Sequence, residues 1–210
     1  MNTHTFVFND FQENTYIIYD ESGEAAIIDP GCNNDFEIEE LEIFISENNL
    51  KPKYLLLTHG HIDHILGVKY ISSKYGLKTH MNKNDAFLLE TADQIANYYG
   101  IFFNGINKDF TDIDDSTVFR LGNEKINCIH VPGHSPGSIC FYNPENKILI
   151  AGDVLFHSGI GRTDLPGGNY DQLINGIKNK LFNLPENVQV FPGHGIKTSI
   201  KFEKVNNPFF

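Results

Sequence analysis

Short apolar runs separated by polar turns dominate the start of the chain, a pattern typical of β-strands. "HTFVFN" (4–9), "NTYIIYD" (14–20) and "AAIID" (25–29) predict three strands. Over residues 35–49 the apolar positions then recur at near-helical spacing between acidic residues, which predicts a helix. "KYLLLT" (53–58) predicts a buried strand directly after it.

The rest of the chain repeats this order of strands followed by helices. Residues 100–116 are polar and lack periodicity, so we expect an irregular connection there. The pattern predicts helices at 63–76, 82–100, about 170–182 and briefly after Lys197, and strands at 77–81, 117–121, 125–131, 138–142, 147–151 and 188–192. Such an order indicates an α/β fold with two packed sheets and helices outside, a four-layer αββα sandwich. We expect a single domain, 1–210, made of two similar halves, about 1–105 and 106–210.

Composition narrows the possible function classes. The chain has 210 residues, 40% of them hydrophobic and 20% charged, as in folded globular proteins. The net charge of −11 argues against nucleic acid or an anionic membrane as a partner, because both require a basic face. No apolar run has the ~20 residues of a membrane span, and the N-terminus does not have the pattern of a signal peptide. The three widely spaced cysteines predict free buried thiols. We therefore expect a cytoplasmic protein, whose oligomeric state the sequence leaves open.

Histidine and aspartate residues follow four of the predicted strands at the point where each strand ends. "YLLLT" runs into "HGHIDH" (59–64), "INCIHV" into "PGHSPGS" (132–138), "KILIA" into "GDVLF" (152–156) and "VQVF" into "PGHG" (192–195). Functional groups gather in such loops when sheets are covered by helices. The four loops offer seven candidate metal ligands: His59, His61, Asp63, His64, His134, Asp153 and His194.

Seven ligands are too many for one tetrahedral ion and suit two. His59 and His61, two residues apart, can bind one ion, while Asp63 and His64 can turn toward a second. Asp153 could bridge both ions. Imidazole and carboxylate ligands suit zinc, manganese or iron, so we expect two divalent metal ions, Zn²⁺ first, with iron or manganese as alternatives.

Taken together, "THGHIDH", "GHS", "GD" and "PGHG", in this order, resemble the metallo-β-lactamase superfamily. Within it the chain is most similar to the glyoxalase II group of thioester hydrolases, and this resemblance covers nearly the whole chain. It is carried by "FQENTYII" (11–18), "IDPG" (28–31), "GRTDLPGG" (161–168) and "NNPF" (206–209). The resemblance implies an αββα fold with a dinuclear site between its halves. It also implies the ligand sets: His59, His61 and His134 for the first metal, Asp63, His64 and His194 for the second, with Asp153 bridging.

The same resemblance implies a reaction. A metal-bound hydroxide would hydrolyse a small-molecule thioester such as S-D-lactoylglutathione, with Asp63 orienting the hydroxide and a thiolate leaving. Full-length members of the group carry a further C-terminal helical region that contacts glutathione. Only sixteen residues follow His194 here, so the chain resembles a short single-domain form. The acyl and thiol parts of the substrate therefore stay open.

Other readings of the same motifs stay open. A persulfide dioxygenase of the superfamily would need one iron, bound by His59, His134 and Asp153, and a lactonase or β-lactamase would be another hydrolase. A non-catalytic metal-binding module is a further possibility. His61 argues against the branch that reduces oxygen or nitric oxide, which carries an acid there. Ser135 lacks a base of its own and is disfavoured as a nucleophile.

Supporting roles are expected for several neighbours. Asp29 in "IIDPG" is expected either to hydrogen-bond a ligand histidine or to be a simple turn residue. Arg162 is expected either to pair with Asp164 and brace the loop, the preferred interpretation, or to meet a substrate carboxylate. Four aromatic residues are expected either to wall the pocket or to pack in the core: Tyr98, Tyr99, Phe102 and Phe103. Of the other histidines, His4, His80 and His130 are expected to be structural and His157 is ambiguous.

Overall fold

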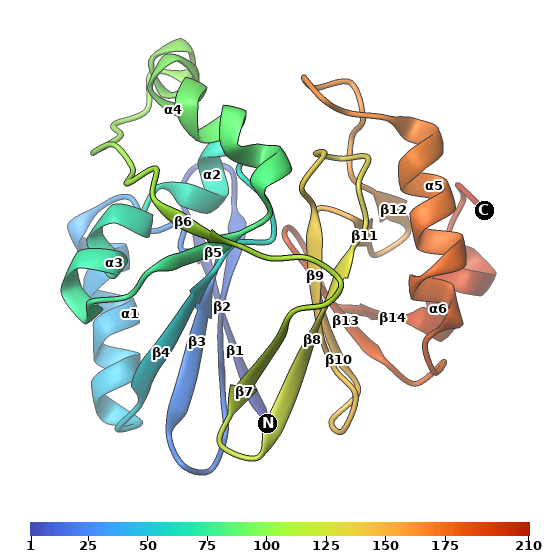
Figure 1. Cartoon of the computed structure of the whole chain (residues 1–210), viewed down its shortest axis with the longest axis horizontal. Coiled ribbons are helices and arrows are strands. Elements are labelled where there is room, and N and C mark those ends of the chain that lie inside the picture. Colours follow the sequence, from blue (N-terminus) through green and yellow to red (C-terminus); the bar gives the residue numbers. More distant parts are fainter.

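Two six-stranded sheets face each other in the computed structural model, which describes all 210 residues (Figure 1). The first sheet contains, in spatial order, β1 (Asn2–Phe8), β2 (Glu13–Tyr19), β3 (Glu24–Ile28), β4 (Lys51–Leu56), β5 (Thr79–Met81) and β6 (Phe110–Asp112). The second contains β14 (Thr198–Ser199), β13 (Gln189–Pro192), β10 (Ile148–Gly152), β9 (Ile139–Asn143), β8 (Glu124–His130) and β7 (Val118–Leu121).

Helices cover the outer face of each sheet (Figure 1). The first sheet carries α1 (Asp35–Glu47), α2 (Ile62–Ile65), α3 (Val68–Tyr75) and α4 (Ala86–Tyr99), and the second carries α5 (Tyr170–Asn179) and α6 (Ile200–Asn206). Smaller elements are the 3₁₀ turns η1 (Lys83–Asp85) and η2 (Leu181–Asn183) and the hairpin of β11 (Leu155–Phe156) and β12 (Gly159–Ile160). None of these helices combines the length and apolarity needed to cross a bilayer.

Strict alternation along the strands produces three separate hydrophobic cores. In β2, Ile17 belongs to the core under the first group of helices, whereas Tyr16 and Ile18 belong to the core between the sheets. In β9, Phe141 faces the same inner core and Cys140 packs under α5 and α6. Because neighbouring residues of a strand point to opposite faces, buried residues on both faces require a covering layer on each side. The predicted four-layer αββα sandwich is thus confirmed.

The two sheets are also hydrogen-bonded to each other along one rim. The Ile139 amide donates to the Thr58 carbonyl oxygen at 2.8 Å, which links β9 to the end of β4. The Asn14 side-chain amide donates to the carbonyl oxygens of Pro192 and Gly195, both at 2.9 Å. The Tyr16 hydroxyl donates to Pro192 as well, at 2.6 Å. These bonds hold the end of β4 against β9, and β2 against the end of β13 and its loop.

Two predicted segments differ from the structure. The expected helix at 63–76 is broken into α2 and α3 at Gly67, whose amide donates to the Pro30 carbonyl oxygen. A side chain at Gly67 would meet the Cys32 sulfur at 2.4 Å, so this close approach sets the break. The connection at 100–116 is irregular except for β6, which pairs in parallel with β5. The three cysteines are free and buried, as predicted.

A fully buried glutamate anchors the C-terminal helix. Glu203 in α6 accepts hydrogen bonds from the Ser158 amide at 3.1 Å and from the Asn207 side chain at 2.7 Å. It also accepts one from the Thr198 hydroxyl at 2.5 Å. One carboxylate therefore joins the β11–β12 hairpin, β14 and the chain end.

We predict that Glu203→Ala lowers the free energy of unfolding by about 2–4 kcal/mol, because the buried side chains of Thr198 and Asn207 and the Ser158 amide lose their acceptor. Urea unfolding at equal metal content measures this change. Glu39→Ala, at an exposed position of α1, is the matched control and should stay within about 0.5 kcal/mol of the parent. Equal effects of the two substitutions would contradict the anchoring role.

Candidate metal centre

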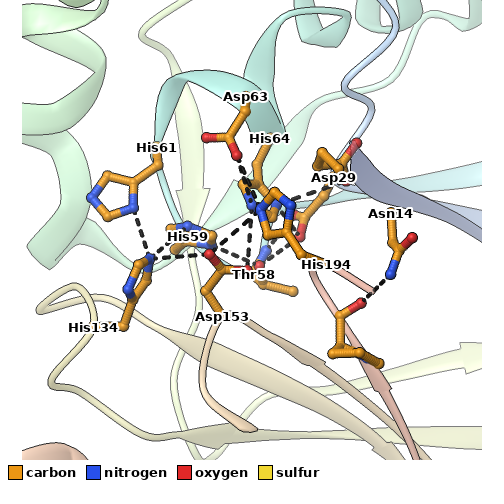
Figure 2. Close-up of polar contacts among 12 residues, drawn as sticks. Asn14, Asp29, Thr58, His59, His61, Asp63, His64, His134, Asp153 and His194 are labelled. Carbon is orange, nitrogen blue, oxygen red and sulfur yellow. Dashed lines mark hydrogen bonds and ion pairs between the residues drawn. The ribbon is translucent and has the colours of Figure 1, made fainter. Parts of the chain in front are cut away.

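All seven predicted ligand residues come together at the rim that joins the sheets. His59 and His61 lie in the loop after β4, and Asp63 and His64 follow them on α2. From the second sheet, His134 follows β8, Asp153 follows β10 and His194 follows β13. Figure 2 shows their polar groups directed toward one another.

Three imidazoles form the first group of potential ligand atoms. His61 Nδ1 lies 2.8 Å from His134 Nε2, which lies 3.2 Å from His59 Nε2. The ligand atoms of these three residues all lie within 4.8 Å of one another. This spacing is compatible with one small cation between the rings.

Asp63, His64 and His194 form the second group. Asp63 Oδ2 lies 3.1 Å from His194 Nε2 and 3.5 Å from His64 Nε2. Asp153 lies between the two groups, because its Oδ2 is 3.5 Å from His134 Nε2 and 3.6 Å from His194 Nε2. The Asp153 carboxylate is therefore placed to bridge two ions if these groups hold them.

Hydrogen bonds on the outer side of the rings fix which nitrogen faces the site. His134 Nδ1 contacts the Arg162 carbonyl oxygen at 2.8 Å, and His194 Nδ1 contacts the Phe11 carbonyl oxygen at 3.2 Å. Carbonyl oxygens only accept, so both Nδ1 atoms carry the proton. In the neutral rings the Nε2 lone pairs then point into the site, as metal ligation requires.

The buried Asp29 carboxylate holds the first two loops together. It accepts hydrogen bonds from the Thr58 amide at 2.7 Å and from the Thr58 hydroxyl at 2.5 Å. Asp29 Oδ2 also lies 3.1 Å from His64 Nδ1. Since the Thr58 hydroxyl donates to Asp29, it is free to accept from His59 Nδ1 at 2.9 Å. The expected contact between Asp29 and a ligand histidine is confirmed.

Burial and neighbouring charges divide the histidines into two kinds. Burial, reinforced by the neighbouring His134, lowers the pKa of His61 to about 3, and burial lowers the pKa of His134 to about 4. The same cause lowers the pKa of His59 well below its usual value. Burial alone would also lower the pKa of His64, but the carboxylates of Asp63, Asp153 and Asp29 outweigh it and raise that pKa. The first group is thus neutral at pH 7 and ready to bind a cation.

Unpaired polar atoms show that the site fits metal ions. His64 Nε2 and Asp153 Oδ1 are buried, lie 3.6 Å apart and have no hydrogen-bond partner. With Nδ1 donating to Asp29, Nε2 is the His64 atom that faces Asp153. The raised pKa of His64 shows that this nitrogen and the surrounding carboxylates favour a positive charge between them, which a proton or a divalent cation supplies. The nitrogen and oxygen donors suit a divalent transition metal.

Asp85 is a supporting residue that the sequence reasoning missed. It is fully buried and accepts from the Gly60 amide at 3.1 Å, the Gly137 amide at 2.5 Å and the Ser135 hydroxyl at 2.7 Å. It therefore ties the loop of His59 and His61 to the loop of His134. At the start of α4 it has the sequence pattern of a helix cap, yet its side chain makes no capping bond. The one sequence signal for this role is the pair of glycines at 60 and 137, because a side chain at either position would collide with Asp85 or its neighbours.

Other predicted positions divide between the site and the core. Arg162 pairs with Asp164 through contacts of 2.7 and 2.8 Å, as expected. Tyr98 and Tyr99 line the pocket, and Phe103 packs on the first core. Phe102 is 74% exposed and belongs neither to the pocket lining nor to a core.

The four remaining histidines lie outside the ligand groups. His4 stacks on Phe44, His80 packs against Tyr54 and Phe119, His130 bonds the Pro136 carbonyl oxygen, and the ambiguous His157 stacks on Phe202. Each has a structural partner of its own. The four are therefore available as controls for the seven.

A pocket of about 690 Å³ opens beside the two groups of ligand atoms. Its floor includes His61, Asp63, His134, Asp153 and His194. This volume is within the range of small-molecule sites. A substrate can therefore reach the site from this side.

We predict that Asp85→Ala weakens metal binding by about 10- to 100-fold, because the two ligand loops lose their common acceptor. Dialysis against buffered zinc followed by elemental analysis measures this change. Asp93→Ala, at an exposed position of the same helix, is the control and should bind zinc like the parent. Unaltered zinc binding in Asp85→Ala would refute the supporting role.

Comparisons with known proteins agree with this geometry. A family model described as the metallo-beta-lactamase superfamily matches residues 8–194. The hydroxyacylglutathione hydrolase GloC of Haemophilus influenzae is 38% identical over 100% of this chain and 98% of its own length. Among solved structures, BLEG-1, a B3 metallo-beta-lactamase, is 31% identical with a TM-score of 0.90 and 99% coverage of both chains.

A second solved structure is TTHA1623 in a di-iron-bound form. It is 32% identical with a TM-score of 0.89 and covers 99% of this chain and 100% of its own. The family match spans most of the chain and includes every one of the seven residues. This chain therefore belongs to the metallo-beta-lactamase superfamily of metal-dependent hydrolases.

Proposed function

We propose that the chain is a dinuclear metal-dependent hydrolase of small-molecule thioesters. The observation that carries the proposal is the pair of ligand groups that share the Asp153 carboxylate. His59, His61 and His134 would hold one ion, and Asp63, His64 and His194 the other. Zinc is the first candidate metal. Iron and manganese are alternatives, and the di-iron-bound form of the similar TTHA1623 supports two ions.

Support for a thioester substrate comes from the similar GloC, which is named a hydroxyacylglutathione hydrolase. Bound divalent cations at such a site acidify a water molecule and polarise a carbonyl group. The Asp63 carboxylate, which lines the pocket, would help to hold an ion and would orient the attacking water. Contacts with His64 and His194 outweigh the effect of burial and lower the pKa of Asp63, which keeps it ionised for this role.

No separate general acid is needed for the leaving group. A thiol has a reference pKa of about 8.5, so it departs as a thiolate with little assistance. Apart from the proposed ligands, the pocket lining contains no Asp, Glu, His or Cys. The lining thus agrees with thioester cleavage, because a thiolate leaving group needs no proton donor.

The metal assignment predicts two ions per chain and loss of activity when either set is disturbed. His59→Ala and Asp63→Ala should each lower kcat/KM on S-lactoylglutathione by at least about 10²-fold while remaining folded. Elemental analysis and circular dichroism accompany the rate measurements. His157→Ala is the control and should retain the parent metal content and rate, because this ring stacks on Phe202 outside the pocket.

The alternatives give different results in the same experiment. A persulfide dioxygenase would hold a single iron and consume oxygen with glutathione persulfide. A lactonase or β-lactamase would hydrolyse its own ring substrates and leave thioesters intact. A metal-loaded chain that is inert to all of these would be a non-catalytic module. Any of these outcomes, or unchanged rates in the two variants, would refute the proposal.

A further inference from the structure

One wall of the pocket is formed by α4, whose residues on this side are mostly apolar. The helix buries Leu89, Ala92 and Ala96 against the first core. A second, mostly apolar stripe at helical spacing faces the pocket: Phe87, Leu88, Thr91, Gln94, Ile95, Tyr98 and Tyr99. In this stripe Ile95 is 39% exposed and Tyr98 82% exposed. Large apolar side chains left uncovered beside a reactive site mark a ligand contact.

Apolar side chains outside α4 line the pocket as well, namely Phe11, Phe156, Ile160 and Leu165. Phe11 and Tyr99 meet edge to face with ring centroids 5.5 Å apart, so the β1–β2 turn and α4 enclose the pocket on one side. Beyond the side chains of the proposed ligands, the pocket is thus lined mainly by apolar residues.

The pocket lining contains almost no basic side chains that could bind an anionic group of a substrate. Arg162 is the single Arg or Lys among the lining residues, and both of its contacts go to Asp164. Glutathione carries two carboxylates, and proteins recognise carboxylates through unpaired Arg or Lys side chains.

On the basis of the proposed thioester hydrolysis, we propose that the preferred substrate carries an uncharged apolar group of several carbons, which lies against α4. The thiol part carries no carboxylate. The pocket of about 690 Å³ is much larger than a lactoyl group needs. Each further methylene that leaves water adds up to about fourfold in binding. The preference should therefore increase with chain length until the pocket is filled.

Two matched thioester series test this proposal on the metal-loaded full chain. In one series the acyl group grows from acetyl to octanoyl on the neutral thiol N-acetylcysteamine. In the other the acyl group stays acetyl and the thiol grows from ethanethiol to octanethiol. We expect kcat/KM to increase two- to fourfold per methylene in at least one series, which also tells which part lies against α4. We also expect S-lactoyl-N-acetylcysteamine to react faster than S-lactoylglutathione. Flat series, or preference for the glutathione ester, would overturn the proposal.

A substitution pair locates the effect. Ile95→Asp puts a charge into the stripe and should flatten the chain-length dependence. Ile43→Asp makes the same change on α1, at a position 47% exposed and outside the pocket, and should leave it unchanged. Equal chain-length dependence in both variants would contradict the assignment of this wall.

Calorimetric binding of uncleavable S-alkyl-N-acetylcysteamine thioethers separates the pocket from the reaction. Affinity that increases with chain length, while every thioester stays intact, would refute the proposed hydrolysis and retain the apolar pocket. If thioesters are hydrolysed but neither the rate nor the thioether affinity depends on chain length, the proposed preference for apolar substrates would be refuted and the proposed hydrolysis retained.

Discussion

The Asp29 carboxylate is the contact on which the geometry of the site depends. It is 1% exposed, and its backbone has the positive φ of +48° that non-glycine residues rarely adopt. From this position one carboxylate binds the end of β4 through Thr58 and orients the His64 ring. Through the Thr58 hydroxyl it also orients His59. The loops of both ligand groups thus share one buried acceptor.

Local patterns were enough to predict most of the fold. In β2 the adjacent residues Tyr16, Ile17 and Ile18 are all apolar, and neighbouring residues of a strand point to opposite faces. Such a strand requires a covering layer on each side, and all three side chains are buried in the structure. The convergence of the seven side chains was predictable for a related reason. Each of them follows a strand, and the ends of β4, β10 and β13 meet at the rim where Thr58 and Pro192 join the sheets. The ligand assignment itself remains a prediction.

Features created by distant contacts could not be predicted. Gly67 breaks a helical pattern because its amide meets Pro30, and no property of the segment itself shows this. The three residues of β6 are too few and too polar to indicate a strand, and they pair only because β5 offers an edge. Asp85 has the local pattern of a cap, and only the folded chain shows that it joins two loops. The apolar stripe of α4 is equally ambiguous in sequence, because core and pocket faces have the same composition.

The proposed ligands come from both sheets, with His59, His61, Asp63 and His64 on one side and His134, Asp153 and His194 on the other. Ions held there would connect the two sheets through their ligands and so stabilise the native state. By mass action, each tenfold rise in free ion above the dissociation constant adds about 1.4 kcal/mol per site to the stability of the native state. Metal supply would then govern the resistance of this chain to heat and proteases as well as its catalysis, and starvation for the ion would shorten its lifetime.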